Sequence, residues 1–209
     1  TAGYAVANLQ SPIRNLQSVK RSSSAIAITA DGHLVLAVNP DSNTLSLVDA
    51  VSRTLLAEIA VGVDPRTVAV DDAGTRAYVA NRGSGSVSVV DLAARAAVAA
   101  IPVGPEPWGV VASPDGRYVY VAVTGDDRIA VLDSTALTVT QSLPVANRPA
   151  GLSLSDDGRI LYATHLLTNT ITVLTVRPYT VYLPLILKGT STDQAGSAQP
   201  STVNWSLIT

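Results

Sequence analysis

A repeat with a period of 42 residues constrains the fold of this chain more than any other feature. Four glycines lie in Asp-Gly or Ala-Gly pairs at intervals of 42 residues: Gly32, Gly74, Gly116 and Gly158. Two other residue types keep the same interval: Asp49, Asp91 and Asp133, and Pro65, Pro107 and Pro149. Periods of roughly 20–50 residues are typical of solenoids, propellers and related arrays. The chain therefore contains several copies of one structural unit.

Each copy reads as four short β-strands. In the third copy the strand-like runs are PWGVVAS (107–113), RYVYVAV (117–123), RIAVLD (128–133) and TVTQSLPV (138–145). β-branched and aromatic residues favour strands, and Asp-Gly between two such runs favours a hairpin because glycine adopts the positive φ that the turn requires. AARAAVAA (93–100) is the best helix candidate, but its register makes it a fourth strand. We therefore predict an all-β β-propeller with four-stranded antiparallel blades.

Three motifs carry a family resemblance: YVAN (78–81), VSVVD (87–91) and IPVG (101–104). With them, the segment from about 21 to 175 resembles the YVTN family of β-propeller repeats. The resemblance implies the fold more specifically than the function, because such propellers serve as surface-layer, binding and redox-enzyme scaffolds. The copies also differ from one another. The position of Asn81 holds Asn39, Val123 and His165 in the other copies, and the aspartate that ends the third strand is replaced by Thr175 in the last.

The register divides the propeller, residues 1–189, into four recognisable blades at 23–64, 65–106, 107–148 and 149–189, followed by a C-terminal tail at 190–209. Residues 1–22 read as two strands of a partial blade. PSTVNWS (200–206) resembles PRTVAVD (65–71), so a strand at 200–207 is predicted to close this blade from the other terminus. No segment supplies the blade's second strand. Two outcomes stay open: an irregular five-bladed ring, or part of a larger protein with further blades.

The most apolar run of the chain, VYLPLILK (181–188), takes the register of the fourth strand in the last blade. Its proline is tolerable in an outermost strand, which can lack one backbone donor. The run leaves little polar face because of its large side chains: Tyr182, Leu183, Leu185, Ile186 and Leu187. We expect its outer side to be covered by the tail or by a neighbouring subunit.

Composition excludes several functions. The formal net charge is -2 and no basic run occurs, so nothing indicates a nucleic-acid partner. The chain has no cysteine, which excludes disulfides and thiolate chemistry, and its apolar runs are shorter than the roughly 18 residues of a membrane span. The chain also has no methionine, and its start (Thr1-Ala2-Gly3) suits a mature N-terminus. We expect an extracellular, cell-surface or periplasmic protein, in which Asn204 is a formal glycosylation site.

Blade geometry predicts where a ligand would bind. The loops from a blade's second to its third strand, and from its fourth strand to the next blade, emerge together at the mouth of the central channel. The candidate binding residues on this face are Arg66, Arg82, Glu106, Trp108, Asp126, Asp127, Arg148 and His165. Trp108 either stacks on a ligand or partner, or fills a gap between blades. Asp126 and Asp127 either bind a cation or form a solvated turn.

Metal binding and catalysis find no support in the sequence. His33 and His165 are predicted at opposite ends of their strands, and neither has a nucleophile or carboxylate at a recognisable spacing. The predicted channel strands are small and apolar: SAIAI (24–28), RTVAV (66–70), WGVVA (108–112) and AGLSL (150–154). We predict no metal, no cofactor and no catalytic residue.

Two functions remain at this point. The favoured one is a non-catalytic secreted or cell-surface propeller that binds a protein or a glycan, or serves as a structural subunit of a larger assembly. The alternative is an enzyme or redox-partner subunit that resembles propeller lactonases or quinoprotein dehydrogenases. The first is favoured because the sequence shows no channel-lining acids, metal ligands or cofactor clamp.

Overall fold

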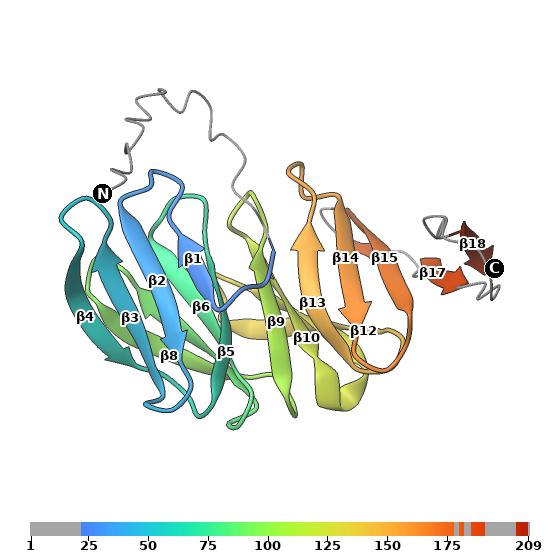
Figure 1. Cartoon of the computed structure of the whole chain (residues 1–209), viewed down its shortest axis with the longest axis horizontal. Helices are drawn as coiled ribbons and strands as arrows, with labels where there is room; N and C mark the ends of the chain where they lie inside the picture. Colours follow the sequence, from blue (N-terminus) through green and yellow to red (C-terminus); the bar gives the residue numbers. More distant parts are fainter. Residues whose placement is uncertain (1–21, 178–179, 182–184, 191–203, 209) are drawn as a thin grey trace, which may run out of the picture.

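The computed structural model describes residues 22–177, 180–181, 185–190 and 204–208. Within these ranges the chain forms β-strands and one short 3-10 turn at Thr124–Asp126, so the all-β prediction is confirmed. Four antiparallel sheets stand side by side (Figure 1). No helix of the described part is long and apolar enough to cross a membrane.

The first three sheets follow chain order and are called blades 1 to 3. Blade 1 contains β1 (Ile26–Ile28), β2 (Leu34–Asn39), β3 (Thr44–Asp49) and β4 (Thr54–Ala60). Blade 2 contains β5 (Pro65–Val70), β6 (Arg76–Asn81), β7 (Ser86–Asp91) and β8 (Ala96–Pro102). Blade 3 contains β9 (Pro107–Ala112), β10 (Tyr118–Val123), β11 (Arg128–Asp133) and β12 (Thr138–Pro144). Each sheet lies inside one predicted blade, and the alanine-rich run that resembles a helix belongs largely to strand β8.

Blade 4 contains more strands than the other three. It contains β13 (Pro149–Leu154), β14 (Ile160–His165), β15 (Thr170–Arg177), β17 (Leu185–Thr190) and β18 (Asn204–Ile208), while β16 (Thr180–Val181) forms a short hairpin with β15. The described part of the fourth strand is β17, which starts at Leu185, whereas residue 181 belongs to β16. Tyr182 and Leu183 lie outside the described residues, whereas Leu185, Ile186 and Leu187 belong to β17.

The strand predicted to close the ring lies elsewhere. β18 pairs antiparallel with β17, with Gly189 opposite Trp205, and so extends the outer edge of blade 4. The resemblance of 200–206 to a first strand was misleading because a free edge accepts any extended segment through its backbone groups. The partner that was predicted for this strand, the partial blade at 1–22, lies outside the described residues except for Ser22.

The repeat is also a repeat of backbone conformation. The four turn glycines have φ between 65° and 73°. In each of the first three copies, three further positions are left-handed at the same 42-residue interval: Asn43, Gly85 and Asp127; Arg53, Arg95 and Leu137; Asp64, Glu106 and Arg148. Non-glycine residues rarely adopt this conformation, so its recurrence shows that the loops, as well as the strands, share one geometry.

The hydrophobic core lies between neighbouring blades in three clusters. Between blades 2 and 3, for example, Tyr78 and Val87 of one sheet face Val110 and Val119 of the next. Alternate side chains of each strand point to opposite faces, so every inner blade contributes to two clusters. Burial of both faces is what holds one blade against the next.

The first strands of the blades are packed closely at the channel. The segment that leads into β1 crosses the channel: Ser24 bridges to Val68, and the Ser23 N–H donates to the Leu152 carbonyl at 2.8 Å. A Cβ on Gly109 would approach the Ala150 carbonyl oxygen closer than 3.0 Å. The small residues of these strands therefore allow backbone to approach backbone.

Candidate functional site

The mouth of the channel is built by loops that hydrogen-bond to one another. Three residues, Asp64, Glu106 and Arg148, end the connections between blades and have φ of 55°, 52° and 53°. The backbone carbonyl of each accepts a hydrogen bond from the loop between the second and third strands of the blade that follows. The donors are the backbone N–H groups of Arg82 (to Asp64, 2.9 Å), Thr124 (to Glu106, 3.1 Å) and Leu166 (to Arg148, 3.0 Å). The loops thus present side chains from fixed backbone positions.

Trp108 has two guanidinium groups over its ring. The Cζ atoms of Arg66 and Arg82 lie 5.1 and 5.8 Å from the ring centroid. Trp108 is half-buried, and its carbonyl accepts the Thr67 hydroxyl of blade 2 at 2.5 Å. Cation–π attraction therefore adds to packing in fixing the ring.

Ion pairs connect the arginines into one network. Arg66 Nη2 lies 2.9 Å from Asp64 Oδ2, and Arg82 Nη1 lies 3.4 Å from the same oxygen. Arg82 Nη2 contacts Glu106 Oε1 at 2.7 Å, and Arg148 Nη2 contacts Glu106 Oε2 at 2.6 Å. These five charged residues and Trp108 are called the mouth cluster below.

Glu106 is the bridging residue of the mouth cluster. The hydrogen bond from Arg148, together with the positive charges of Arg82 and Arg148, lowers the pKa of the Glu106 carboxyl. Isolated surface ion pairs contribute little to stability, but a carboxylate held between two guanidiniums is fixed in position. Glu106 is therefore an ionised anchor for both arginines.

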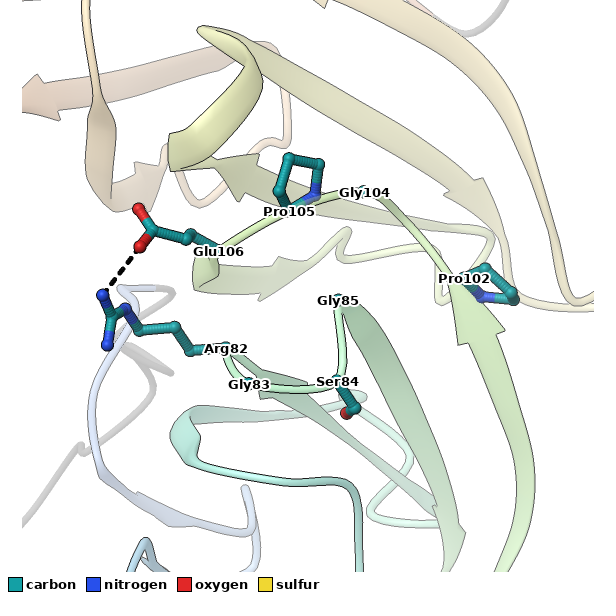
Figure 2. Close-up of a pocket in the computed structure, with 8 residues that line it drawn as sticks. All are labelled: Arg82, Gly83, Ser84, Gly85, Pro102, Gly104, Pro105 and Glu106. Carbon is teal, nitrogen blue, oxygen red and sulfur yellow. Dashed lines mark hydrogen bonds and ion pairs between the residues drawn. The ribbon is translucent and has the colours of Figure 1, made fainter.

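A hollow of about 620 Å³ opens beside the mouth cluster. Figure 2 shows the Arg82–Glu106 pair at one end and the loop from Gly83 to Gly85 facing Gly104 and Pro105. A Cβ on Gly104 would come within 2.8 Å of both Arg128 Nη2 and Asp126 Oδ2, and the φ of 107° at this position also disfavours any side chain. Backbone and small side chains form most of the lining, and the charged pair forms its polar end.

Asp126 and Asp127 lie at the edge of this face and point to different partners. Asp126 Oδ2 pairs with Arg128 Nε at 3.3 Å, and Asp127 Oδ1 accepts the backbone N–H of Arg148 at 2.7 Å. Among the described residues, no group of three or more His, Asp or Glu side chains is arranged to hold a metal ion. The two aspartates thus hold the loops of blade 3.

His165 is buried in blade 4 and bonds within its own sheet. Its Nε2 lies 2.8 Å from Thr172 Oγ1, and burial lowers the pKa of its imidazole. The corresponding pairs are Asn39 with Ser46 and Asn81 with Ser88, at 2.8 and 3.0 Å. His33 lies at the other end of its own strand, 3.1 Å from Asp31. The imidazole of His165 is therefore a cross-strand contact outside the mouth cluster.

Sequence reasoning selected Arg66, Arg82, Glu106, Trp108 and Arg148, and the structure brings all five together. It overlooked Asp64, the sixth member. The signal was available, because Asp64 lies 42 residues before Glu106 and 84 before Arg148. The three occupy one position of the repeat with different charges.

Comparisons with known proteins agree with this architecture. A family model described as a lactonase with a 7-bladed beta-propeller matches residues 104–200. The fold is a β-propeller. A structure of hydrazine synthase from Kuenenia stuttgartiensis resembles this propeller with a TM-score of 0.69 and 24% identity over 99% of this chain. No curated protein matches the chain significantly.

Two further solved structures resemble the propeller. One is a functionally unknown protein from Desulfotomaculum acetoxidans, with a TM-score of 0.66 and 16% identity over 77% of this chain. The other is the dihydro-heme d1 dehydrogenase NirN in complex with DHE, with a TM-score of 0.59 and 16% identity over 78%. The chain spans 66%, 54% and 37% of these three structures in the order given. At such identities the likeness concerns the fold.

Proposed function

We propose that this propeller is a binding subunit of a larger enzyme assembly and that its mouth face receives an anionic ligand. The observation that carries the proposal is the mouth cluster itself. Arg66 and Arg82 lie over Trp108, and Arg148 is joined to them through Glu106. The cluster lies beside the hollow described above, at the face where the loops of three blades meet.

The chemistry of the cluster favours a carboxylate or phosphate ligand. Each guanidinium carries five N–H donors, and the contacts to Asp64 and Glu106 involve four nitrogen–oxygen pairs among three arginines. Donors are therefore left for the oxygens of a ligand, and the fork of a guanidinium matches the two oxygens of such a group. The indole of Trp108 offers an apolar surface for the rest of the molecule.

The same geometry is poorly suited to proton transfer. A general base works best with a pKa near the operating pH, whereas the two arginines lower the pKa of Glu106. His165 is buried and directed to Thr172. The residues of the mouth face are thus better placed to hold an anion than to move a proton.

The similar proteins support a role inside an enzyme. They include a lactonase family, a hydrazine synthase and a dihydro-heme d1 dehydrogenase. They favour the redox-partner or lactonase-like alternative over a secreted surface module, for which they offer no support. In the proposed role, this propeller binds and orients an anionic group while a partner supplies the reactive centre.

The first test measures what the purified protein contains. We expect no stoichiometric chromophore in its absorption spectrum and no tightly bound metal by elemental analysis. A bound redox cofactor on this chain would contradict the division of roles, because the propeller itself would then carry the reactive group.

The second test measures anion binding through Trp108. A Trp205→Phe background leaves Trp108 as the sole tryptophan. We expect succinate and citrate to change its emission saturably, and the neutral amide succinamide to leave it unchanged. Arg66→Gln or Arg148→Gln should weaken the response at least tenfold, whereas Arg53→Gln, an exposed arginine of a blade 1 turn, should leave it intact. Equal responses in all variants would refute the site.

A further inference from the structure

The loops between the second and third strands meet the end of the fourth strand in the same way in blades 1, 2 and 3. One position of the repeat makes this contact, and it is occupied by Asn43, Gly85 and Asp127. The backbone carbonyl of each accepts, at 2.9 Å, the N–H of the residue that follows the fourth strand of its own blade. Their φ angles are also alike, at 57°, 63° and 52°. The three loops therefore hold this position in one place relative to the junction with the next blade.

In blades 1 and 3 the side chain at this position also binds the junction. Asn43 Oδ1 accepts the backbone N–H of Asp64 at 2.8 Å. Asp127 Oδ1 accepts the backbone N–H of Arg148 at 2.7 Å. A side-chain oxygen on one methylene group thus satisfies the backbone donor of the junction residue in both blades.

Blade 2 lacks this contact because its loop has Gly85 at the same position. The corresponding junction residue is Glu106, whose φ of 52° matches the 55° and 53° of its equivalents. Among the described residues, the Glu106 N–H has no hydrogen-bond acceptor. A backbone donor that the fold does not pair is left for water or for a ligand.

The hollow of about 620 Å³ lies beside this open donor. Gly85 and Glu106 both line it (Figure 2). A Cβ on Gly85 would lie 2.9 Å from the carbonyl oxygen of Gly104, so a side chain here would have to displace backbone. The loop of blade 2 therefore offers a donor and open space, whereas the loops of blades 1 and 3 supply the acceptor themselves.

The charge of each junction residue indicates which acceptor fits. The uncharged amide of Asn43 bonds to the acidic residue Asp64, and the carboxylate of Asp127 bonds to the basic residue Arg148. Glu106 is acidic, and its two arginine partners hold it as a carboxylate. A second carboxylate beside it would be repelled, since like charges destabilise each other at short range. An uncharged carbonyl oxygen meets no such repulsion.

We propose that the hollow beside Gly85 binds the carboxamide group of a small molecule. Its carbonyl oxygen accepts the Glu106 N–H, in the way that the Asn43 side chain accepts the equivalent N–H in blade 1. The volume of the hollow lies in the range of small-molecule sites. The proposal does not depend on the anion of the mouth cluster, and a ligand that reaches both sites would combine an amide with an anionic group.

The backbone amide resonance of Glu106 tests this site in the whole chain. In ¹⁵N-labelled protein, acetamide should shift this resonance saturably, while the amides of Asp64 and Arg148 stay in place because they are already bonded. Acetate has the same shape with a negative charge, and it should bind about fivefold more weakly. No saturable shift with acetamide would overturn the site. Equal affinities for the two probes would overturn its preference for an uncharged group.

Two variants separate the contributions of the open donor and of the charge. Glu106→Gln keeps the N–H and removes the negative charge, so the preference for acetamide should fall to about twofold or less. Asp127→Gly removes the acceptor in blade 3, so the Arg148 amide should now respond to acetate. An unchanged preference in the first variant would contradict the role of charge, and an unresponsive Arg148 amide in the second would contradict the equivalence of the loops. Trp108 emission reports the anion at the arginines, so either proposal can fail without the other.

Discussion

Gly109 offers a sharp test of how closely the blades meet at the channel. It lies in β9, and a Cβ there would clash with the backbone carbonyl of Ala150 in β13 and lie 3.1 Å from Ser23 Oγ. The carbonyl oxygen cannot rotate away, so two first strands must separate to accept Gly109→Ala. Overpacking of this kind costs about 1–3 kcal/mol, and a clash with backbone belongs at the upper end, about 3 kcal/mol.

Gly151→Ala is the matched control. Gly151 occupies the same position one repeat later, but a Cβ there would meet the Thr164 hydroxyl, a side-chain group that can rotate. Replacing glycine by alanine in a strand also lowers the entropy of the unfolded chain, which stabilises by about 0.4–1 kcal/mol. Gly151→Ala should therefore change stability by less than about 1 kcal/mol.

Denaturation in guanidinium chloride, followed by circular dichroism, measures both variants. The free energy of unfolding of Gly109→Ala should fall by about 3 kcal/mol with an unchanged slope, and its Tm by about 6–12 °C for a domain of this size. Equal effects of the two substitutions would show that β9 and β13 do not approach as described.

Three further predictions concern individual contacts. Asn81→Val should cost about 2 kcal/mol in thermal unfolding because it removes the buried hydrogen bonds that the Asn81 amide donates to the hydroxyls of Ser88 and Ser86. The double variant with Ser88→Ala should recover at least half, and a purely additive result would contradict the pairing. In the Trp205→Phe protein, the emission of Trp108 should stay constant above pH 4.5, the ordinary pKa of glutamate, and change only below it. The reason is that the lowered pKa of Glu106 keeps its carboxylate paired with the arginines until more acidic pH. A midpoint above pH 4.5, or the same transition in Glu106→Gln, would contradict this. Asp133→Ala should cost about 1 kcal/mol, since Asp133 Oδ1 accepts two N–H groups of the following turn at 2.8 Å, and unchanged urea unfolding would refute that role.

The fold was predictable because the residues that each turn and strand requires recur in several copies of the repeat. Turn glycines recur at one interval, and Asp49, Asp91 and Asp133 each cap the turn that follows the third strand. A single copy would leave each of these signals ambiguous. Departures in single copies were harder to interpret: Thr175 lacks the capping carboxylate, and there β15 continues to Arg177 and pairs with β16.

The misinterpretations concern segments and side chains whose pairing depends on their position in the fold rather than on their residue type. β18 resembles a first strand in sequence, yet it lies on the open edge of β17, where backbone groups alone decide the pairing. His165 resembles a ligand when taken alone. Its position and that of Thr172 change together through the repeats, from Asn39 with Ser46 to Val123 with Ala130, so a comparison of copies would have shown a cross-strand pair.

The mouth cluster shows how a repeat builds a site from one position. Asp64, Glu106 and Arg148 share the same backbone conformation at successive blade junctions, and that shared geometry brings their side chains to one face. The charge then differs: two acids and one base occur at a position that could have held three like charges. Glu106 consequently reaches Arg82 in one direction and Arg148 in the other, so one network joins three blades. An anion that displaces Glu106 from Arg148 therefore also loosens a link between blades, and ligand binding and blade packing at this face are coupled.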